Sequence, residues 1–136
     1  SHFQTRLLIT DHYKIAKTVK ADGVHLENGD AYTKARLHVY TWQIIGGTAN
    51  TLQDCEALIE QEVDYICLGP FKLTTTKDNS LTVLGINGYT AIIEALKTET
   101  PIIGIGGITT EDVTDILKTG ISGIAVSGEV TRDFNT

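Results

Sequence analysis

The sequence predicts an α/β fold built on a parallel sheet, because apolar runs and helical patterns alternate along its 136 residues. Six short runs rich in Ile, Val and Leu lack the alternation of apolar and polar residues that a half-exposed strand shows. Continuous apolar strands of this kind are typical of parallel sheets that are buried on both faces. Strand, helix and strand in succession indicate βα units with right-handed crossovers. The predicted strands are residues 6–10, 23–26, 43–48, 65–70, 101–107 and 123–128.

The first two helices are assigned between the first three strands. Ile15 and Ala16 each lie about one helical turn before Val19, which supports a helix over residues 12–20. Residues 31–40 are assigned as the second helix.

The later helices have recognisable ends. Thr51 followed three residues later by Asp54 is a capping box, and so is Thr109 followed by Asp112. Gly120 ends the last of these helices. Three apolar stripes are expected to face the sheet, namely Leu52, Cys55, Leu58, Ile59 and Val63; Tyr89, Ile92, Ile93 and Leu96 within residues 88–97; and Val113, Ile116 and Leu117.

Small or polar residues close nearly every predicted strand at its C-terminal end. A (βα)8 barrel, or TIM barrel, builds its active site on this rim from many strands, whereas a doubly wound sheet concentrates its site at one switch point. The spread over six strand ends favours the barrel. Six units are two short of eight, so we expect either an incomplete barrel without its first two strands or an open sheet. The strand ends are Thr10-Asp11, residues 27–30, Thr48, Gly69-Pro70, Gly106-Gly107 and Ser127-Gly128.

Composition excludes several classes of partner and site. The formal net charge is −6 and the basic residues form no tract, which argues against a nucleic-acid or anionic-membrane surface. No apolar stretch reaches the ~18 residues that span a bilayer, and no signal-peptide pattern begins the chain, so we expect a cytoplasmic protein. Cys55 and Cys67 lack CxxC spacing and are expected to be reduced, buried thiols.

Two carboxylates lie just beyond neighbouring strand ends. A single Asp at such a place often caps a helix, but Asp11 and Asp30 together could hold Mg²⁺, which prefers one or two carboxylates with substrate phosphates and water. His25 lies within its strand and is expected to be a packed, hydrogen-bonded residue. The sequence shows no GxSxG motif and no Cys–His pattern, so it indicates no nucleophile–base pair.

Two segments carry the kinds of group that bind phosphate. Gly106-Gly107 before a helix and the later Ser127 resemble the phosphate-binding loops of barrels, in which glycines allow close approach and the helix N-terminus attracts the anion. Thr74 to Thr76 offer hydroxyl and amide donors, and Lys77 offers a charge-assisted contact. The alternatives are a tight turn at the glycines and a solvated polar loop at the threonines.

Four stretches, in this order and spacing, resemble the thiamine phosphate synthase (thiamine-phosphate pyrophosphorylase) family of (βα)8 barrels. They are ADGVHLENGD, IIGGTANT, DYICLGPFKLTTTKD and PIIGIGGIT followed by GISGIAVSGEV, and the resemblance covers residues 7–130. It implies that residues 1–136 form a single domain, the C-terminal three-quarters of such a barrel.

The resemblance also implies an activity. The family joins 4-amino-2-methyl-5-pyrimidinylmethyl diphosphate to a thiazole phosphate and releases pyrophosphate, in a Mg²⁺-dependent transfer that gives thiamine phosphate. Asp11 and Asp30 match its metal ligands, and Lys77 matches its diphosphate-binding lysine; these three are the expected catalytic residues. The remaining substrate positions implied are Thr10 and Thr48 for the pyrimidine, and Thr74, Thr75, Thr76, Gly107, Val126 and Ser127 for the thiazole phosphate.

The sequence departs from the family at several positions. Thr10 replaces the family's usual Asn, and no segment supplies the Gln-x-Arg-x-Lys motif that grips the diphosphate. We therefore expect an N-terminally shortened synthase that is inactive or very weakly active as an isolated chain. Its expected partners are small-molecule substrates, with a homo-oligomer left open. The alternatives are a TenI-like thiazole tautomerase, which lacks a diphosphate substrate, and a non-catalytic phosphate-ligand binding protein.

Overall fold

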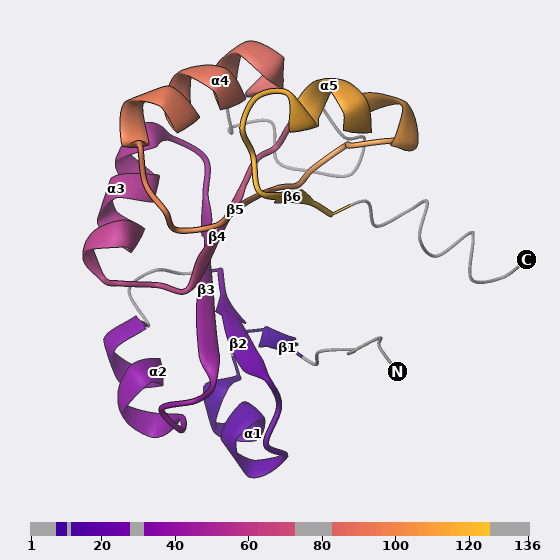
Figure 1. Cartoon of the computed structure of the whole chain (residues 1–136). Helices are drawn as coiled ribbons and strands as arrows, with labels where there is room; N and C mark the ends of the chain where they lie inside the picture. Colours follow the sequence, from indigo (N-terminus) through magenta and orange to yellow (C-terminus); the bar gives the residue numbers. More distant parts are fainter. Residues whose placement is uncertain (1–7, 11, 28–31, 73–82, 126–136) are drawn as a thin grey trace, which may run out of the picture.

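In a computed structural model, the described residues are 8–10, 12–27, 32–72 and 83–125. This part of the chain forms a six-stranded, wholly parallel sheet whose strands follow one another in sequence order (Figure 1). The predicted parallel α/β architecture is therefore confirmed. The strands are β1 (Leu8–Thr10), β2 (Gly23–Leu26), β3 (Ile44–Ala49), β4 (Tyr65–Leu68), β5 (Ile102–Gly104) and β6 (Gly123–Ile124).

A helix follows each of the first five strands, as the βα pattern predicts. The helices lie along the outer side of the curved sheet (Figure 1), and β1 and β6 are the two edges of the sheet that the described residues form. This sheet is open rather than closed into a barrel. The helices are α1 (Tyr13–Thr18), α2 (Tyr32–His38), α3 (Leu52–Glu60), α4 (Gly85–Leu96) and α5 (Val113–Leu117), and a 3-10 turn, η2 (Thr110–Asp112), precedes α5.

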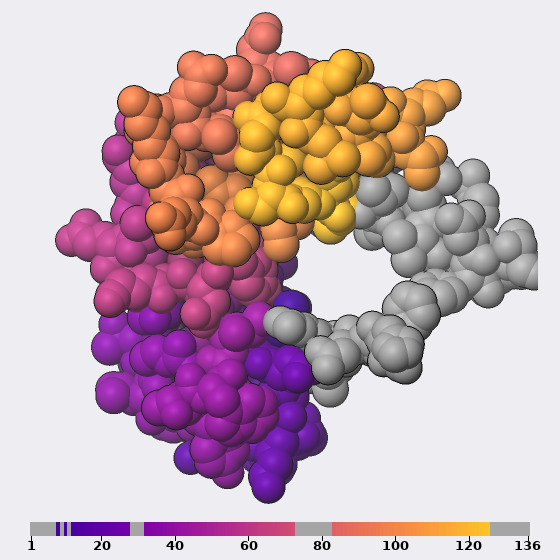
Figure 2. Space-filling view, in the orientation of Figure 1, coloured from indigo at the N-terminus to yellow at the C-terminus, as the bar shows by residue number. Residues whose placement is uncertain are grey.

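The two faces of the sheet differ in burial. Alternate strand residues that point toward the helices are at most 2% exposed and form the core. On the opposite, inner face Tyr65 is buried, but His25 and Cys67 are half-buried and Thr48 is exposed. Figure 2 shows the molecule hollowed on the side away from α3. The expectation of burial on both faces is therefore wrong for the inner face, because the described strands do not close around it. The core strand residues are Val24, Leu26, Ile45, Ala49, Ile66, Leu68 and Ile102.

The helices bury most of the predicted stripes. The Thr51 capping box is present, and Cys55 and Tyr89 are fully buried. Leu117 is an exception at 50% exposed, because the short α5 turns Ile116 to the core and its neighbour points about 100° away. In α1, Ala16 faces the core, while Ile15 and Val19 are more than half exposed.

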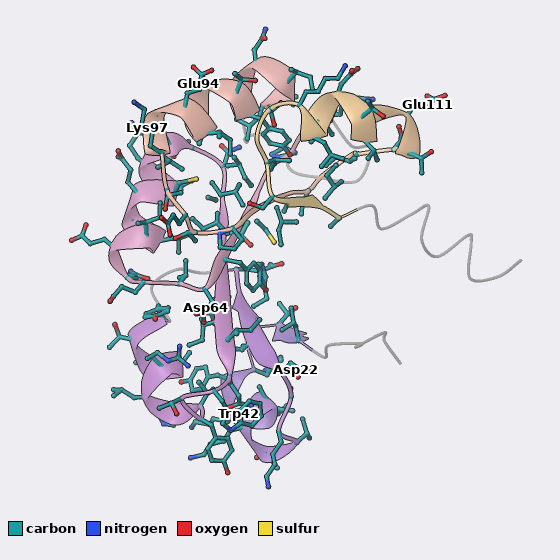
Figure 3. The ribbon with its side chains drawn as sticks, viewed as in Figure 1. Asp22, Trp42, Asp64, Glu94, Lys97 and Glu111 are labelled. Atoms are coloured by element: carbon teal, nitrogen blue, oxygen red, sulfur yellow. The ribbon has the colours of Figure 1, made fainter. Side chains whose placement is uncertain are left out.

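Gln43 is a buried polar residue that joins three segments at the amino end of β3. It follows Trp42, which Figure 3 labels at the end of the molecule near α1 and α2. Its side-chain amide donates to the carbonyls of Ala16 (3.0 Å) and Ala21 (2.8 Å), and its carbonyl accepts from the backbone N–H of Tyr40 (2.8 Å). The side chain therefore ties α1 and the start of β2 to β3.

Replacing Gln43 with leucine is expected to lower the free energy of unfolding by ~1–3 kcal/mol, because buried backbone groups lose their partners. Urea unfolding followed by circular dichroism measures the change. The matched control is Gln53→Leu, at an exposed position of α3, which should change stability by less than about 0.5 kcal/mol. Equal stability of the two variants would contradict this role for Gln43.

Candidate active site at the carboxyl ends of the strands

Three of the predicted site residues lie in the described part of the chain. Thr10 ends β1, Thr48 lies near the carboxyl end of β3, and Gly107 follows β5. Register places Thr10 beside His25 of β2, on the same inner face as Thr48. The other predicted site residues fall outside the described residues, namely Asp11, Asp30, Thr74, Thr75, Thr76, Lys77, Val126 and Ser127.

A hydrogen-bonded group of three side chains crosses the inner face. His25 Nδ1 lies 2.9 Å from the Tyr65 hydroxyl, and His25 Nε2 lies 2.7 Å from Thr48 Oγ1. The rings of His25 and Tyr65 stack with their centroids 5.6 Å apart. The expectation that His25 is a hydrogen-bonded residue of its strand is confirmed, and its partners come from the neighbouring strand β3 and from β4. We call His25, Thr48 and Tyr65 the inner-face triad.

Gly46 lets Tyr65 reach His25 across an intervening strand. Tyr65 is on β4 and His25 on β2, and Gly46 of β3 is in register with both. A Cβ atom on Gly46 would lie 2.0 Å from Cζ of the Tyr65 ring, a distance that real contacts do not show. The absence of a side chain at Gly46 therefore creates the space in which the tyrosine ring lies. Glycine inside a strand often marks such a close approach. Gly46 was therefore the sequence signal that a large side chain, here Tyr65, crosses this strand at the site.

Burial keeps the phenol and the thiol of this face neutral. Desolvation, and to a smaller extent the nearby Cys67, raises the pKa of Tyr65, so the phenol keeps its proton at neutral pH. Burial also raises the pKa of the Cys67 thiol to about 11. Cys55 and Cys67 are both free thiols, as expected. Cys55 is buried, whereas Cys67 is only half-buried. Neither thiol is an activated nucleophile, since the thiolate is the reactive form.

The turn after β5 packs directly against the segment after β4. The backbone N–H groups of Phe71 and Lys72 donate to the carbonyl of Gly106, at 2.9 and 3.1 Å. Gly107 has a φ of +75°, and a Cβ there would lie 2.9 Å from the carbonyl oxygen of Lys72. The glycine pair thus forms a tight turn that brings two loops of the rim together, and phosphate binding there stays a prediction.

An ion pair holds the same two loops. Lys72 Nζ lies 2.9 Å from Asp112 Oδ2. The same carboxylate oxygen accepts from the backbone N–H and the hydroxyl of Thr109, each at 3.0 Å, which confirms the predicted capping box. The hydrogen bond from the Thr109 N–H is the largest cause that lowers the pKa of Asp112, and the hydrogen bond from Lys72 is the second. Asp112 therefore links the start of η2 to the segment that leads into residues 73–82.

Replacing Asp112 with asparagine is expected to reduce the free energy of unfolding by about 1 kcal/mol at neutral pH, because the charge paired with Lys72 is lost. A carboxylate with a lowered folded pKa stabilises fully above the unfolded value of about 3.9, and this stabilisation disappears as pH falls through the folded value. The gap between wild type and variant, measured by urea unfolding, should therefore close in acid. Asp115→Asn on the exposed face of α5 is the control. A gap independent of pH would contradict the ion pair's role.

The described residues carry neither a metal cluster nor a membrane span. Within residues 8–10, 12–27, 32–72 and 83–125, no three His, Cys, Asp or Glu side chains gather so that they could hold a metal ion. Asp11 and Asp30, the predicted Mg²⁺ ligands, lie outside these ranges. No described helix is both long enough and apolar enough to cross a membrane.

Solved structures resemble this fold, among them the following two. Thiamine phosphate pyrophosphorylase from Pyrococcus furiosus superposes with a TM-score of 0.71 at 28% identity, covering 88% of this chain and 55% of that chain. This match confirms the predicted barrel class, of which the described residues form an unclosed part. Nitroalkane oxidase from Streptomyces ansochromogenes superposes with a TM-score of 0.60 at 13% identity, which shows a likeness of fold alone.

Sequence comparisons identify the family. The relative from Bacteroides thetaiotaomicron, a thiamine-phosphate synthase, is 47% identical over 93% of this chain and 62% of its own length. The thiamine-phosphate synthase of Flavobacterium psychrophilum is 44% identical over 98% of this chain and 66% of its own. The chain thus spans a little under two thirds of these curated relatives. A family model described as thiamine monophosphate synthase matches residues 1–130, and the chain therefore belongs to the thiamine monophosphate synthase family.

Proposed function

We propose that the protein carrying this sequence is a thiamine phosphate synthase, which transfers the pyrimidinylmethyl group of its diphosphate to a thiazole phosphate. The observation that carries the proposal is the place of Thr48, at the carboxyl end of β3 on the inner face, with its hydroxyl held by His25. This is the position that the family resemblance assigns to the pyrimidine contact. Identity of 47% to a thiamine-phosphate synthase supports the same activity. A cytoplasmic location stays a prediction.

The proposed reaction is a substitution at a benzylic-type carbon. The bond between the methylene carbon and the diphosphate oxygen breaks, and the oxygen keeps the electron pair. The electron-rich aminopyrimidine stabilises the cation that remains, and the thiazole nitrogen donates its lone pair to form the new C–N bond. The protein has to align two substrates and balance the charge of the leaving diphosphate. Hydroxyls, a lysine and carboxylates suffice for this, without a nucleophilic side chain.

Mg²⁺ fits the two strand ends that carry the predicted ligands. β1 and β2 are hydrogen-bonded neighbours, Asp11 directly follows β1, and Asp30 follows the end of β2 by four residues. In the sequence, the two aspartates therefore follow the carboxyl ends of neighbouring strands. One or two carboxylates with phosphate oxygens and water are the ligands that Mg²⁺ prefers. When bound, the ion would neutralise charge on the diphosphate. We assign Asp11 and Asp30 to hold it and Lys77 to contact the diphosphate.

The thiazole phosphate is assigned to the part of the rim that follows β4 and β5, away from the ends of β1 and β2. Gly107 lies in the tight turn between β5 and η2, next to the backbone of Lys72. Glycine at this turn lets an anion approach the main chain closely. Thr74, Thr75, Thr76, Val126 and Ser127 are the further residues proposed for this substrate.

A chimera tests the proposal, because the chain spans only part of its relatives. Residues 1–130 would replace the matching segment of the Bacteroides thetaiotaomicron synthase, and isothermal titration would measure binding of the pyrimidine diphosphate. A synthase should bind it tightly with Mg²⁺ and much more weakly after chelation of the metal. Binding of the thiazole phosphate without metal-dependent affinity for the pyrimidine diphosphate would contradict the synthase and favour the thiazole tautomerase.

A further inference from the structure

In each hydrogen bond of the inner-face triad, the position of the proton determines which side chain donates and which accepts. A neutral imidazole has one nitrogen that donates a proton and one that accepts, and the hydrogen bond at one nitrogen fixes the role of the other. His25 contacts Tyr65 through Nδ1 and Thr48 through Nε2. The proton of the Tyr65 hydroxyl therefore decides what the Thr48 hydroxyl can offer to a ligand.

Tyr65 is positioned as the donor of this pair. Its side chain is only 8% exposed, and a buried hydroxyl requires an acceptor for its proton. Among the described residues, the acceptor within hydrogen-bond distance of the Tyr65 hydroxyl is His25 Nδ1. The phenol therefore donates to Nδ1, and in a neutral imidazole this leaves the ring proton on Nε2. Nε2–H then donates to Thr48 Oγ1, so the proton of Thr48 itself points to a different partner.

Thr48 is the exposed end of this chain of hydrogen bonds. It lies two residues beyond Gly46 along β3, and its side chain is exposed on the inner face, in register with Cys67 of β4. A threonine hydroxyl in isolation rotates and can donate or accept equally well. The two preceding hydrogen bonds limit that freedom: Nε2–H occupies one of the two lone pairs of Oγ1 and keeps the hydroxyl proton turned away from His25, so Thr48 has its own proton left to donate.

We propose that Tyr65 and His25 are positioning residues that make Thr48 a hydrogen-bond donor, so that the ligand group recognised there is an acceptor. This inference rests on the proposed function, within which the acceptor is an unprotonated ring nitrogen of the aminopyrimidine, rather than its amino group. The opposite tautomer of His25 would present the lone pairs of Thr48 and select the amino group. The triad therefore selects one orientation of the pyrimidine ring.

The tautomer can be measured without any substrate. Nitrogen-15 NMR of the histidine-labelled chain distinguishes a protonated from an unprotonated ring nitrogen, and the His25→Gln variant identifies the His25 signals. We expect protonation at Nε2 and an unprotonated Nδ1 at neutral pH, and we expect Tyr65→Phe to reduce this preference in a chain whose circular dichroism is unchanged. An Nδ1–H tautomer or a doubly protonated ring in the wild type would overturn the proposal.

Kinetics in the chimera test the consequence for the ligand. Loss of one hydrogen bond should raise KM for the pyrimidine diphosphate about three- to tenfold in Thr48→Val and in Tyr65→Phe, with KM for the thiazole phosphate unchanged. Thr48→Ser should restore the wild-type KM, because it keeps the hydroxyl. A pyrimidine analogue with C–H in place of the contacted ring nitrogen should bind wild type and Thr48→Val equally weakly. Tyr40→Phe, at an exposed tyrosine, is the matched control.

The outcomes separate this proposal from the proposed function. A chimera that turns over normally, with KM unchanged in both Thr48→Val and Tyr65→Phe, overturns the positioning role while leaving the synthase in place. A chimera that binds neither substrate, although its His25 has the Nε2–H tautomer, contradicts the synthase and leaves the polarity of Thr48 intact.

Discussion

Replacing Gly46 with alanine is expected to destabilise the chain by ~1–3 kcal/mol, the usual consequence of forcing extra volume into a packed site. The added methyl group would lie 2.0 Å from the Tyr65 ring, so the ring must move away from His25 and the triad loses its first hydrogen bond. This reverses the ordinary trend, since Gly→Ala inside a strand usually stabilises slightly. Urea unfolding measures the loss of stability.

Two comparisons make this prediction specific. Gly123→Ala is the matched control, because a Cβ there would lie 3.8 Å from Ile103, an ordinary contact, and its effect on stability should be small. Removing the ring should also remove the clash, so Gly46→Ala should be nearly neutral in a Tyr65→Ala background. An alanine at position 46 that destabilises equally with and without the tyrosine ring would show that the ring's path over Gly46 is not the cause.

Replacing Lys77 with alanine is expected to lower kcat/KM of the chimera by about 100-fold or more, the scale seen when a group that stabilises developing charge is removed. Lys77 lies outside the described residues, and its assignment to the diphosphate is a proposal. The free energy of unfolding of the variant, measured by thermal unfolding, should change by less than about 0.5 kcal/mol, as expected for a lysine that serves the substrate rather than the fold. Lys118→Ala, at an exposed position after α5, is the control and should keep full activity. Unchanged turnover in Lys77→Ala would identify residues 74–77 as a solvated polar loop.

The sequence predicted those parts of the fold that depend on local patterns. Six apolar runs are six parallel strands, and both capping boxes begin helices at Thr51 and Thr109. Such features depend on residues three or four positions apart, so one sequence displays them fully. The tight turn at Gly106-Gly107 was one of the two interpretations of these glycines, and both have positive φ.

The sequence did not predict the arrangement of the inner face, because that arrangement depends on contacts between residues far apart in the chain. His25 and Tyr65 are 40 residues apart, and their contact requires Gly46 on the strand between them. The sequence suggested a hydrogen-bonded histidine but not its partners, because sheet register sets them. Leu117 was misassigned to the core because the five-residue α5 presents only one of two adjacent apolar residues inward.

Product formation by the chimera is the most direct measurement of the proposed function. With both substrates and Mg²⁺, a synthase forms thiamine phosphate and pyrophosphate in equal amounts, which chromatography and a coupled pyrophosphate assay quantify independently. Omitting either substrate or chelating the metal should abolish both products, and the unmodified Bacteroides thetaiotaomicron synthase provides the reference rate. A chimera that unfolds cooperatively like that reference, yet forms no thiamine phosphate under these conditions, would contradict the assignment of this chain as a thiamine phosphate synthase.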